Sequence, residues 1–398
     1  MNIQEKIKSL TNKYLKDSIT TRRYIHENPE LSFNEVNTSK YVCSKLDEYG
    51  IPYTAGYVKT GIIGIIKGEN PDKKVVGLRA DMDALPISEK SDGPVCSKNN
   101  GVMHACGHDA HTASLLGTAR ILNELKDQWE GTIVLIFQPA EERYPGGAKL
   151  MMEEGALDHP KPDLILGQHV LPDMETGHVG FKEGKYMASG DEVHLTVKGK
   201  GGHAALPHTF TDTVLASAQI IVALQQIVSR FVPASIPTVL SFGKVIANGA
   251  TNIMPEEVKI SGTLRTMNEE WRAKIKKKIT AIATQTADLM GTVCEVDIKD
   301  GYPVVNNHSE VTKNAFSYAR EYLGETNVEK IESRMTAEDF GYYTEKYPCT
   351  YYRFGVKQPE GKYTGGLHTA GFNLNESSLE TSIGIMAYLA VQFLNKDD

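Results

Sequence analysis

Residues 103–114 (MHACGHDAHTAS) place three histidines, a cysteine and an aspartate within twelve positions. Cys106 and His108 are separated by one glycine, so a thiolate and an imidazole could face one ion from a loop. Such ligands suit zinc or another borderline divalent metal. His111 lies three residues further on and is either a third ligand or a packed neighbour. The segment also fits a helix start with a small buried cysteine, so taken alone it leaves both interpretations open.

Two adjacent carboxylates, Glu141 and Glu142, follow an apolar run at 131–138 (GTIVLIFQ). Neighbouring carboxylates repel each other, and placing both at the end of a buried strand is costly unless a positive charge lies nearby. A metal could bind one carboxylate while the other takes a proton from water, whose pKa the ion lowers towards about 7. A pair of surface glutamates is the alternative, but the position after a buried strand favours a metal site.

Further side chains of the same kind follow other apolar segments. His169 ends the run PDLILGQHV, and His368 lies in the glycine-rich segment GGLHTAGF. Asp81 and Asp83 are two residues apart after a third apolar run, and one of them could orient a metal ligand. Each of these residues could be structural when taken alone. Five separate positions nevertheless supply a plausible ligand set for two metal ions: Cys106, His108, Glu142, His169 and His368.

A second group of polar residues lies in the middle of the chain. His203 follows two glycines in GKGGHAALPH, Asn252 lies in ATNIMP, and Arg265 ends the run ISGTLRT. As a set they offer a cation for a substrate carboxylate and donors for an oxyanion. A turn histidine, a turn asparagine and an exposed arginine are the structural alternatives, and the residues alone do not decide between them.

The candidate ligands all lie beside segments with strand or helix patterns. Apolar runs at 61–68, 74–81, 131–138 and 162–170 predict strands, and helical spacing predicts a helix over 110–125. Strands that alternate with helices predict an α/β fold with a mixed, largely parallel sheet. Ligands of such sheets bind at the carboxyl ends of the strands, which is where these candidates fall.

The middle of the chain has a different pattern. Strand signals at 191–198, 238–246, 257–267 and 293–299 alternate with helical signals over two longer stretches, 212–232 and 269–290. This order, β-α-β-β-α-β, is typical of a ferredoxin-like α+β unit. We therefore expect a discontinuous catalytic domain, 1–186 and 301–398, interrupted by an inserted domain, 187–300.

Composition narrows the function classes. The 398 residues carry a formal net charge of −7, which argues against a nucleic-acid or anionic membrane surface. The N-terminus lacks the apolar centre of a signal peptide, and no uninterrupted apolar stretch is long enough to span a membrane. The five cysteines are dispersed and form no CxxC pair, which indicates a reduced, cytoplasmic protein.

Eight ordered motifs carry a family resemblance: HENPELSFNE, RADMDALP, MHACGHDAHTASLLG, FQPAEE, GKGGHAALPH, NIMPEEV with GTLRT, MTAEDF and GGLHTAGF. Over nearly the whole chain the sequence resembles the di-metal amidohydrolases. That family includes hippurate hydrolase, indole-acetyl-amino-acid hydrolases and N-acyl-amino-acid deacylases, and it is related to aminoacylases and zinc carboxypeptidases. The resemblance implies a zinc-peptidase-like catalytic domain and an inserted domain that serves dimerisation and acts as a lid.

The resemblance also implies residue roles. The five candidate ligands would hold two divalent ions (zinc, manganese, cobalt or nickel), Glu141 would be the general base, and Asp83 would orient a ligand. His203 would stabilise the oxyanion, in related enzymes across the interface of a homodimer or a dimer of dimers. Asn252 and Arg265 would hold the carbonyl and carboxylate of the substrate.

The expected reaction is hydrolysis of the amide bond of a small N-acyl-L-amino acid, with neither nucleic acid nor a membrane as partner. One alternative is a metallo-dipeptidase or aminopeptidase, which needs a free α-amine. Another is a metal-dependent binding protein without catalysis, although binding alone does not need a general base. A cysteine hydrolase that uses Cys106 with a histidine is disfavoured, and it would survive chelators.

Overall fold

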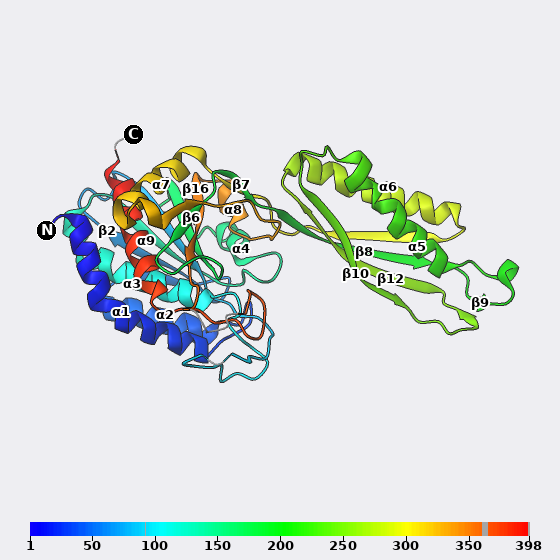
Figure 1. The fold of residues 1–398 in the computed structure, drawn as a ribbon, viewed down its shortest axis with the longest axis horizontal. Helices are drawn as coiled ribbons and strands as arrows, with labels where there is room; N and C mark the ends of the chain where they lie inside the picture. The colour runs from blue at the N-terminus through cyan, green and yellow to red at the C-terminus, as the bar shows by residue number, and fades with distance from the viewer. Residues whose placement is uncertain (92, 360–364, 397–398) are drawn as a thin grey trace. The chain divides into compact units, whose positions relative to one another are not determined.

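The computed structural model describes residues 1–91, 93–359 and 365–396. The chain forms two compact units (Figure 1). Unit 1 comprises Met1–Gly184, Asn306–Glu332 and Tyr342–Asp398, and unit 2 comprises Lys185–Val305 and Ser333–Gly341. Each unit has its own buried apolar core, as expected for a chain too long for a single core.

Unit 1 is built on an eight-stranded mixed sheet in the order β1-β2-β4-β3-β5-β16-β6-β15. Parallel pairing joins β3 to β4 and β5, β5 to β16, and β6 to β15. The remaining neighbours pair antiparallel. The strands are β1 (Tyr53–Tyr57), β2 (Gly61–Lys67), β3 (Val75–Asp81), β4 (Thr132–Gln138), β5 (Leu164–Leu171), β6 (Val179–Phe181), β15 (Val328–Lys330) and β16 (Cys349–Gly355).

The central strands of this sheet are apolar along their whole length. Every residue of β4 (TIVLIFQ) and of β5 (LILGQHVL) is buried. Strands covered on both faces read as continuous apolar runs rather than as alternating ones, which is why the sequence pattern located them.

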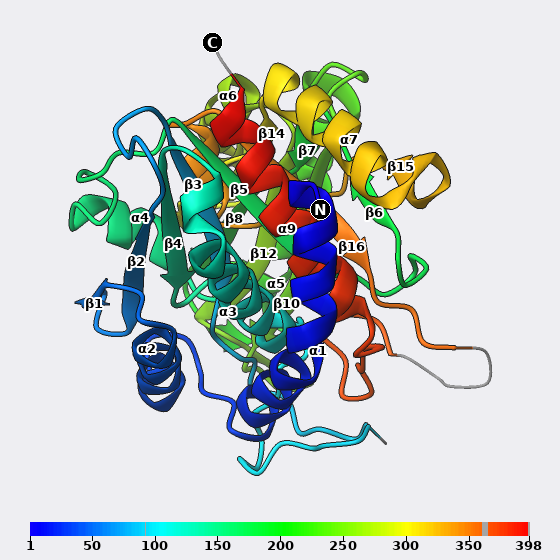
Figure 2. The same ribbon diagram turned by 90° about the vertical axis from the view of Figure 1, so that its left-hand side faces the viewer.

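Helices pack against the sheet of unit 1. Helix α1 begins with a capping box between Asn2 and Glu5, and it buries Ile7, Tyr14 and Ile25 on one face. Helices α1, α3 and α9 pack side by side, and α3 and α9 contact β3 (Figure 2). The helices are α1 (Ile3–Glu27), α2 (Val36–Tyr49), α3 (His108–Glu124), α4 (Gly147–Glu153), α7 (Ser309–Leu323), α8 (Gly341–Thr344) and α9 (Ser378–Asn395), with short turns η1 (Lys126–Gln128) and η4 (Glu325–Asn327).

Unit 2 contains a four-stranded antiparallel sheet in the order β10-β12-β8-β13, with α5 and α6 packed on it. Its elements are β8 (Ser189–Lys198), β9 (Gly202–His203), η2 (Pro207–Thr209), α5 (Thr213–Leu224), η3 (Ile227–Phe231), β10 (Thr238–Ala247), β11 (Ile253–Met254), β12 (Glu257–Thr266), α6 (Glu269–Leu289) and β13 (Val293–Lys299). Strands β7 (Gly184–Met187) and β14 (Val305–Asn307) pair where the chain passes between the units.

Alternation and helical periodicity explain the core of unit 2. In β8, Val193, Leu195 and Val197 are buried, while the residues between them are more exposed. Helix α6 buries Ile275 and Ile279 at helical spacing. The chain order β8-α5-β10-β12-α6-β13 is the predicted β-α-β-β-α-β order. The predicted fold class, a mixed α/β sheet with an inserted ferredoxin-like unit, is therefore confirmed.

One segment of unit 2 is unusually apolar. Thr213–Phe231, which spans α5 and η3, is long and apolar enough to cross a membrane by length and composition, although no uninterrupted apolar run marks it in the sequence. Core helices of soluble proteins pass the same test. Here one face of α5 packs on β8 and β12, while Val214, Leu215 and Val222 are exposed.

Candidate metal centre and substrate-binding residues

Three neighbouring parallel strands bring the predicted metal site together. Strands β4, β3 and β5 are adjacent, and their carboxyl ends lie at one edge of the sheet. Asp81 ends β3, Glu141 and Glu142 follow β4, and His169 lies near the end of β5. The edge of the sheet thus gathers carboxylates and imidazoles that are far apart in the sequence.

The turn into α3 supplies two more side chains. Gly107 has a φ of 83°, and a Cβ atom there would lie 2.7 Å from Cγ2 of Val170. Only glycine fits this turn without strain. The turn puts Cys106 just before α3 and makes His108 the first residue of the helix. Both side chains are buried.

The five predicted ligands converge. The Cys106 Sγ lies 3.4 Å from His169 Nε2, and His368 Nε2 lies 3.1 Å from Glu142 Oε1. Their ligand atoms form two overlapping groups in which all atoms lie within 4.8 Å of one another. These groups are Cys106 with His108 and His169, and Cys106 with Glu142 and His368.

This arrangement fits divalent metal ions. The His108 Nε2 atom is buried, has no hydrogen-bond partner among the described residues, and lies 3.9 Å from Glu142 Oε1. Buried polar atoms without partners are costly in a folded protein unless a ligand satisfies them. One thiol, three imidazoles and one carboxylate form a donor set typical of zinc and similar metals, and each of the two overlapping groups could hold an ion.

Asp83 lies where the resemblance predicts an orienting carboxylate. Its side chain accepts the backbone N–H groups of Glu141 and Glu142 at 3.1 and 3.0 Å and the Ser32 hydroxyl at 2.6 Å. His108 Nδ1 is 3.2 Å from the carboxylate and 3.0 Å from the Asp83 carbonyl oxygen. An Nδ1–H that donates to these oxygens leaves Nε2 to bind a metal.

The charge of Asp83 is preserved in this setting. Burial alone would raise the pKa of the Asp83 carboxyl, but the hydrogen bond from His108 and that residue's charge hold the pKa below its usual range. A fixed negative charge in contact with Nδ1 makes the opposite ring nitrogen a better electron donor.

His111 lies beside the predicted ligands, and it forms with Asp81 and His108 another group of side chains that could hold a metal ion. Its Nδ1 lies 2.6 Å from Asp81, and its Nε2 accepts the backbone N–H of Val170 at 3.0 Å. Both ring nitrogens are therefore used, which favours the packed interpretation over a third ligand in the CGHDAH segment. Burial lowers the pKa of the His111 ring, in keeping with a neutral ring that accepts a hydrogen bond.

His169 is held in the form that binds metals. Its Nδ1 lies 2.8 Å from the carbonyl oxygen of Val170, so Nδ1 carries the proton and Nε2 faces Cys106. Burial, and after it the positive charge of Arg353, lowers the pKa of His169. A neutral imidazole with a free Nε2 is the usual metal ligand.

Glu141 lies next to the ligands. Its carboxylate belongs with His108 and Glu142 to a further group of side-chain atoms within 4.8 Å of one another, and the residue is only 6% exposed. The backbone turn that carries it begins at Ala140, whose N–H donates to Glu35 at 2.8 Å.

Ser32 and Glu35 were not assigned from the sequence. Ser32 donates to Asp83, and Glu35 accepts from the turn of the two glutamates. Both belong to the motif HENPELSFNE, whose density of polar residues between two helical segments was the available signal.

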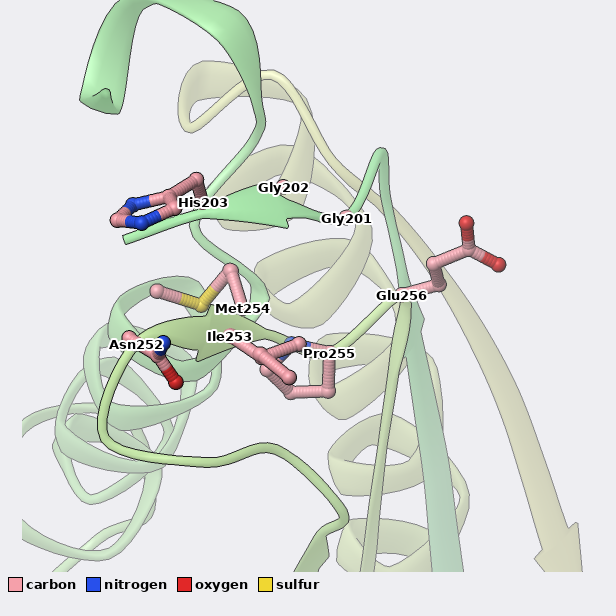
Figure 3. Close-up of a pocket in the computed structure, with 8 residues that line it drawn as sticks. All are labelled: Gly201, Gly202, His203, Asn252, Ile253, Met254, Pro255 and Glu256. Atoms are coloured by element: carbon pink, nitrogen blue, oxygen red, sulfur yellow. The ribbon is translucent and has the colours of Figure 1, made fainter. Parts of the chain in front are cut away.

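The predicted substrate residues lie in unit 2. His203 on β9 pairs with Ile253 on β11, and Asn252 directly precedes that strand. Both residues line a cavity of about 440 Å³ (Figure 3). Arg265 lies on β12 opposite Val239 and is not part of this lining. The structure therefore groups His203 with Asn252 and places Arg265 elsewhere in the same unit.

His203 is exposed, and its ring is oriented by its own loop. The Nδ1 atom accepts the backbone N–H of Ala205 at 3.1 Å. In the neutral ring the proton is then on Nε2, which has no partner among the described residues and is a donor of the kind that stabilises an oxyanion. The backbone around Asn252 is fixed in turn, because its carbonyl oxygen accepts the N–H of Ala204 at 3.0 Å.

Comparison with known proteins adds independent information. Residues 77–392 match the family described as peptidase family M20/M25/M40. An N-acyl-L-amino acid amidohydrolase of Geobacillus stearothermophilus is 41% identical over 307 residues, covering 77% of this chain and 82% of that protein. The hippurate hydrolase of Campylobacter jejuni is 38% identical, covering 94% of this chain and 95% of its own length.

A solved structure shares the whole architecture. A dinuclear metal-binding peptidase of the M20 family from Bacillus subtilis superposes with a TM-score of 0.83 at 35% identity, covering 97% of this chain and all of that chain. The family match begins inside β3 and ends inside α9, so it includes the inserted unit and all of the predicted metal ligands. The chain belongs to peptidase family M20/M25/M40 and is a hydrolase.

Proposed function

We propose that this enzyme hydrolyses the amide bond of N-acyl-L-amino acids and releases a carboxylate and the free amino acid. The observation that carries the proposal is the convergence of five metal-type ligands, two of which, His108 and Glu142, lie beside the buried carboxylate of Glu141. Two relatives that align over most of the chain are named for reactions of this type.

Two divalent ions fit the ligand set of Cys106, His108, Glu142, His169 and His368. When bound, the ions would polarise the amide carbonyl and lower the pKa of water. Zinc, manganese, cobalt and nickel all suit one thiolate, three imidazoles and a carboxylate. The five cysteines are all free thiols, which fits a reducing, cytoplasmic setting for a site that contains one of them.

Glu141 would act as general base and then as general acid. Its carboxylate takes a proton from the attacking water while the water oxygen bonds to the amide carbon. It then gives the proton to the nitrogen as the C–N bond breaks, so the products are a carboxylate and an amine. The backbone N–H of Glu141 donates to Asp83, and this bond fixes the backbone position from which the Glu141 side chain extends.

The residues of unit 2 would recognise the substrate. The free Nε2–H of His203 suits donation to the oxyanion of the tetrahedral intermediate. Asn252, next to His203 in the same cavity, suits the carbonyl of the substrate, and the cationic Arg265 suits its carboxylate.

A second copy of the chain is the proposed partner of unit 2. Strand β10 is an edge of its sheet, and Val239, Val245 and Ile246 on it are exposed. The exposed apolar side chains of α5 belong to the same unit. Open edges and apolar patches of this kind are typical of interfaces. We infer a homodimer formed through unit 2, which light scattering of the purified protein would detect directly.

The substrate proposal is tested by amino-acid release from N-acetyl, N-benzoyl and unacylated dipeptide substrates. Chelator-stripped protein is assayed before and after addition of Zn²⁺ or Mn²⁺. Activity that returns with metal on acylated substrates supports the proposal. Activity only on free dipeptides would instead identify a dipeptidase. Metal binding without any hydrolysis would point to a binding protein, and activity without metal would overturn the metal centre.

A further inference from the structure

Glu35 is a fully buried carboxylate that belongs to neither group of predicted ligands. Its Oε1 accepts the backbone N–H groups of Phe33 at 2.9 Å and Ala140 at 2.8 Å. Its Oε2 accepts the Thr60 hydroxyl at 2.8 Å. A buried carboxylate is costly unless such partners satisfy it, so the position has a structural or functional reason.

The side chain of Glu35 does not cap α2. It is the residue that precedes α2, but its side chain makes no capping hydrogen bond there. Glu30 from the same motif does so instead, because its carboxylate accepts the N–H groups of Asn37 and Thr38 at 2.8 and 2.9 Å. The side chain of Glu35 is thereby left to bind the turn after β4, which lies 105 residues away in the sequence.

That turn has an unusual backbone. Ala140 has a φ of 52°, a left-handed conformation that is sterically unfavourable for a residue with a Cβ atom. Its N–H donates to Glu35, and the next two N–H groups, of Glu141 and Glu142, donate to Asp83. Three consecutive N–H groups thus converge on two buried carboxylates, which together fix the turn.

We propose that Glu35 is a positioning residue that holds Ala140 in its left-handed conformation and so aims the carboxylates of Glu141 and Glu142 at the metal centre. The inference rests on the proposed function, because it assigns to Glu35 the orientation of the proposed base and of one proposed ligand. The described hydrogen bonds of the Glu35 side chain go to Phe33, Thr60 and Ala140, and to none of the five predicted ligands.

The contribution of Glu35 is geometric rather than electrostatic. Burial, and after it the nearby charge of Asp83, raises the pKa of Glu35 to about 7, so a neutral group is compatible with its place. A glutamine has the same reach and keeps one oxygen for the N–H groups of Phe33 and Ala140. The Thr60 hydroxyl can then accept from the amide. An aspartate keeps the charge but is one methylene too short to reach Ala140.

Glu35→Gln keeps the length of the side chain and removes its charge, whereas Glu35→Asp keeps the charge and shortens the side chain. Glu35→Gln should keep metal affinity and kcat within about threefold of the wild type. Glu35→Asp should lower metal affinity by about 10- to 100-fold, as loss of a group that orients a ligand does. It should also lower kcat more than it changes KM, because the base is misaligned. Metal affinity is measured by chelator competition and kcat and KM with the preferred substrate.

Glu30→Ala is the matched control. It removes a carboxylate of the same motif that also binds backbone N–H groups, but those groups belong to α2. It should lower the melting temperature without changing metal affinity. If Glu35→Asp behaves like this control, or if Glu35→Gln is the impaired variant, the positioning role is overturned. A wild-type protein that binds no metal would instead overturn the proposed function.

Discussion

Asp83 in unit 1 and His203 in unit 2 are held in opposite ways. In unit 1, Asp83 uses both carboxylate oxygens to bind two backbone N–H groups, a hydroxyl and an imidazole, and it is fully buried. In unit 2, His203 is exposed, and the described hydrogen bond of its ring is to its own loop. The side chains that hold a metal ion must be fixed in place before the ion binds. Residues that recognise a substrate need only reach it, so the difference fits the proposed division between catalysis in unit 1 and substrate recognition in unit 2.

Removing one of the five proposed metal ligands in unit 1 should have the largest effect. Glu142→Ala should lose metal and reduce turnover to background, because it removes a carboxylate that lies 3.1 Å from one imidazole and 3.9 Å from another. Metal content by elemental analysis and turnover are measured on the same preparation. Glu153→Ala, on the exposed side of α4, is the control. Full metal occupancy in Glu142→Ala would refute the ligand assignment.

Glu141→Gln tests the neighbouring carboxylate, which is proposed to move protons and not to bind metal. The variant should keep its metal ions and lose about 10²- to 10⁴-fold in kcat, the usual worth of a general base. Elemental analysis and steady-state kinetics check both parts. Substantial turnover by the metal-loaded variant would contradict the role of Glu141 as base.

His203→Ala tests the exposed set. Loss of an oxyanion donor should lower kcat by about 10²- to 10³-fold. Metal content and melting temperature should stay unchanged, because the His203 ring bonds only within its loop in the part of the chain that the structure describes. The exposed His208, five residues further on, provides the control His208→Ala. A large drop in metal content for His203→Ala would erase the distinction between the two sets.

Unit 2 also contains a rigid charge cluster, and it should affect stability alone. The carboxylate of Asp191 is buried and accepts Arg272 at 2.7 and 2.8 Å, with Lys276 Nζ at 2.8 Å. Asp191→Asn should destabilise unit 2 by about 3 kcal/mol, because the buried Arg272 loses the better buried of its two carboxylate partners, Asp191 and Glu269. Metal affinity should not change. The effect is measured by denaturant unfolding of metal-loaded protein.

The loss of stability caused by Asp191→Asn should depend on pH. Burial alone would raise the pKa of the Asp191 carboxyl, but the bonds and charge of Arg272, joined by those of Lys276, hold it below its usual range. The stability from this carboxylate is therefore present above its unfolded pKa and is lost as the pH falls through the lower, folded pKa. The difference between wild type and Asp191→Asn should shrink below about pH 4.

The positions of the two tryptophans allow the unfolding of unit 2 to be followed by fluorescence. Trp271 lies in unit 2, and Trp129 lies in unit 1. A Trp129→Phe background leaves Trp271 as the only tryptophan, so its fluorescence reports on unit 2. An Asp191→Asn variant that unfolds like the wild type at neutral pH would show that the cluster contributes nothing.

The candidate ligands could be predicted from the sequence because each lies next to a recognisable local pattern. Apolar runs mark parallel strands, and polar residues after such runs must meet at one edge of the sheet. Glu142 and His169 were found in this way. His111 was left undecided, because only the positions of Asp81 and the Val170 N–H show that both ring nitrogens are used.

Other features depend on contacts that no sequence window contains. The bond between Glu35 and Ala140 joins segments 105 residues apart, and the left-handed conformation of Ala140 has no signature in a residue that is usually helical. The separation of Arg265 from the cavity of His203 depends on strand register in unit 2. Register is set by pairing with β10 and β11, which periodicity alone does not reveal.

The position of β16 in the sheet has a consequence for the nascent chain. It pairs with β5 on one side and β6 on the other, yet it is translated only after all of Lys185–Val305. At ordinary rates of translation, the hydrogen-bonding edge of β5 waits roughly ten to thirty seconds for its partner. An open edge recruits other strands. The ribosome-bound intermediate is therefore a stage at which the edge of β5 is open to other strands, and His368, the last of the five predicted ligands, emerges later still.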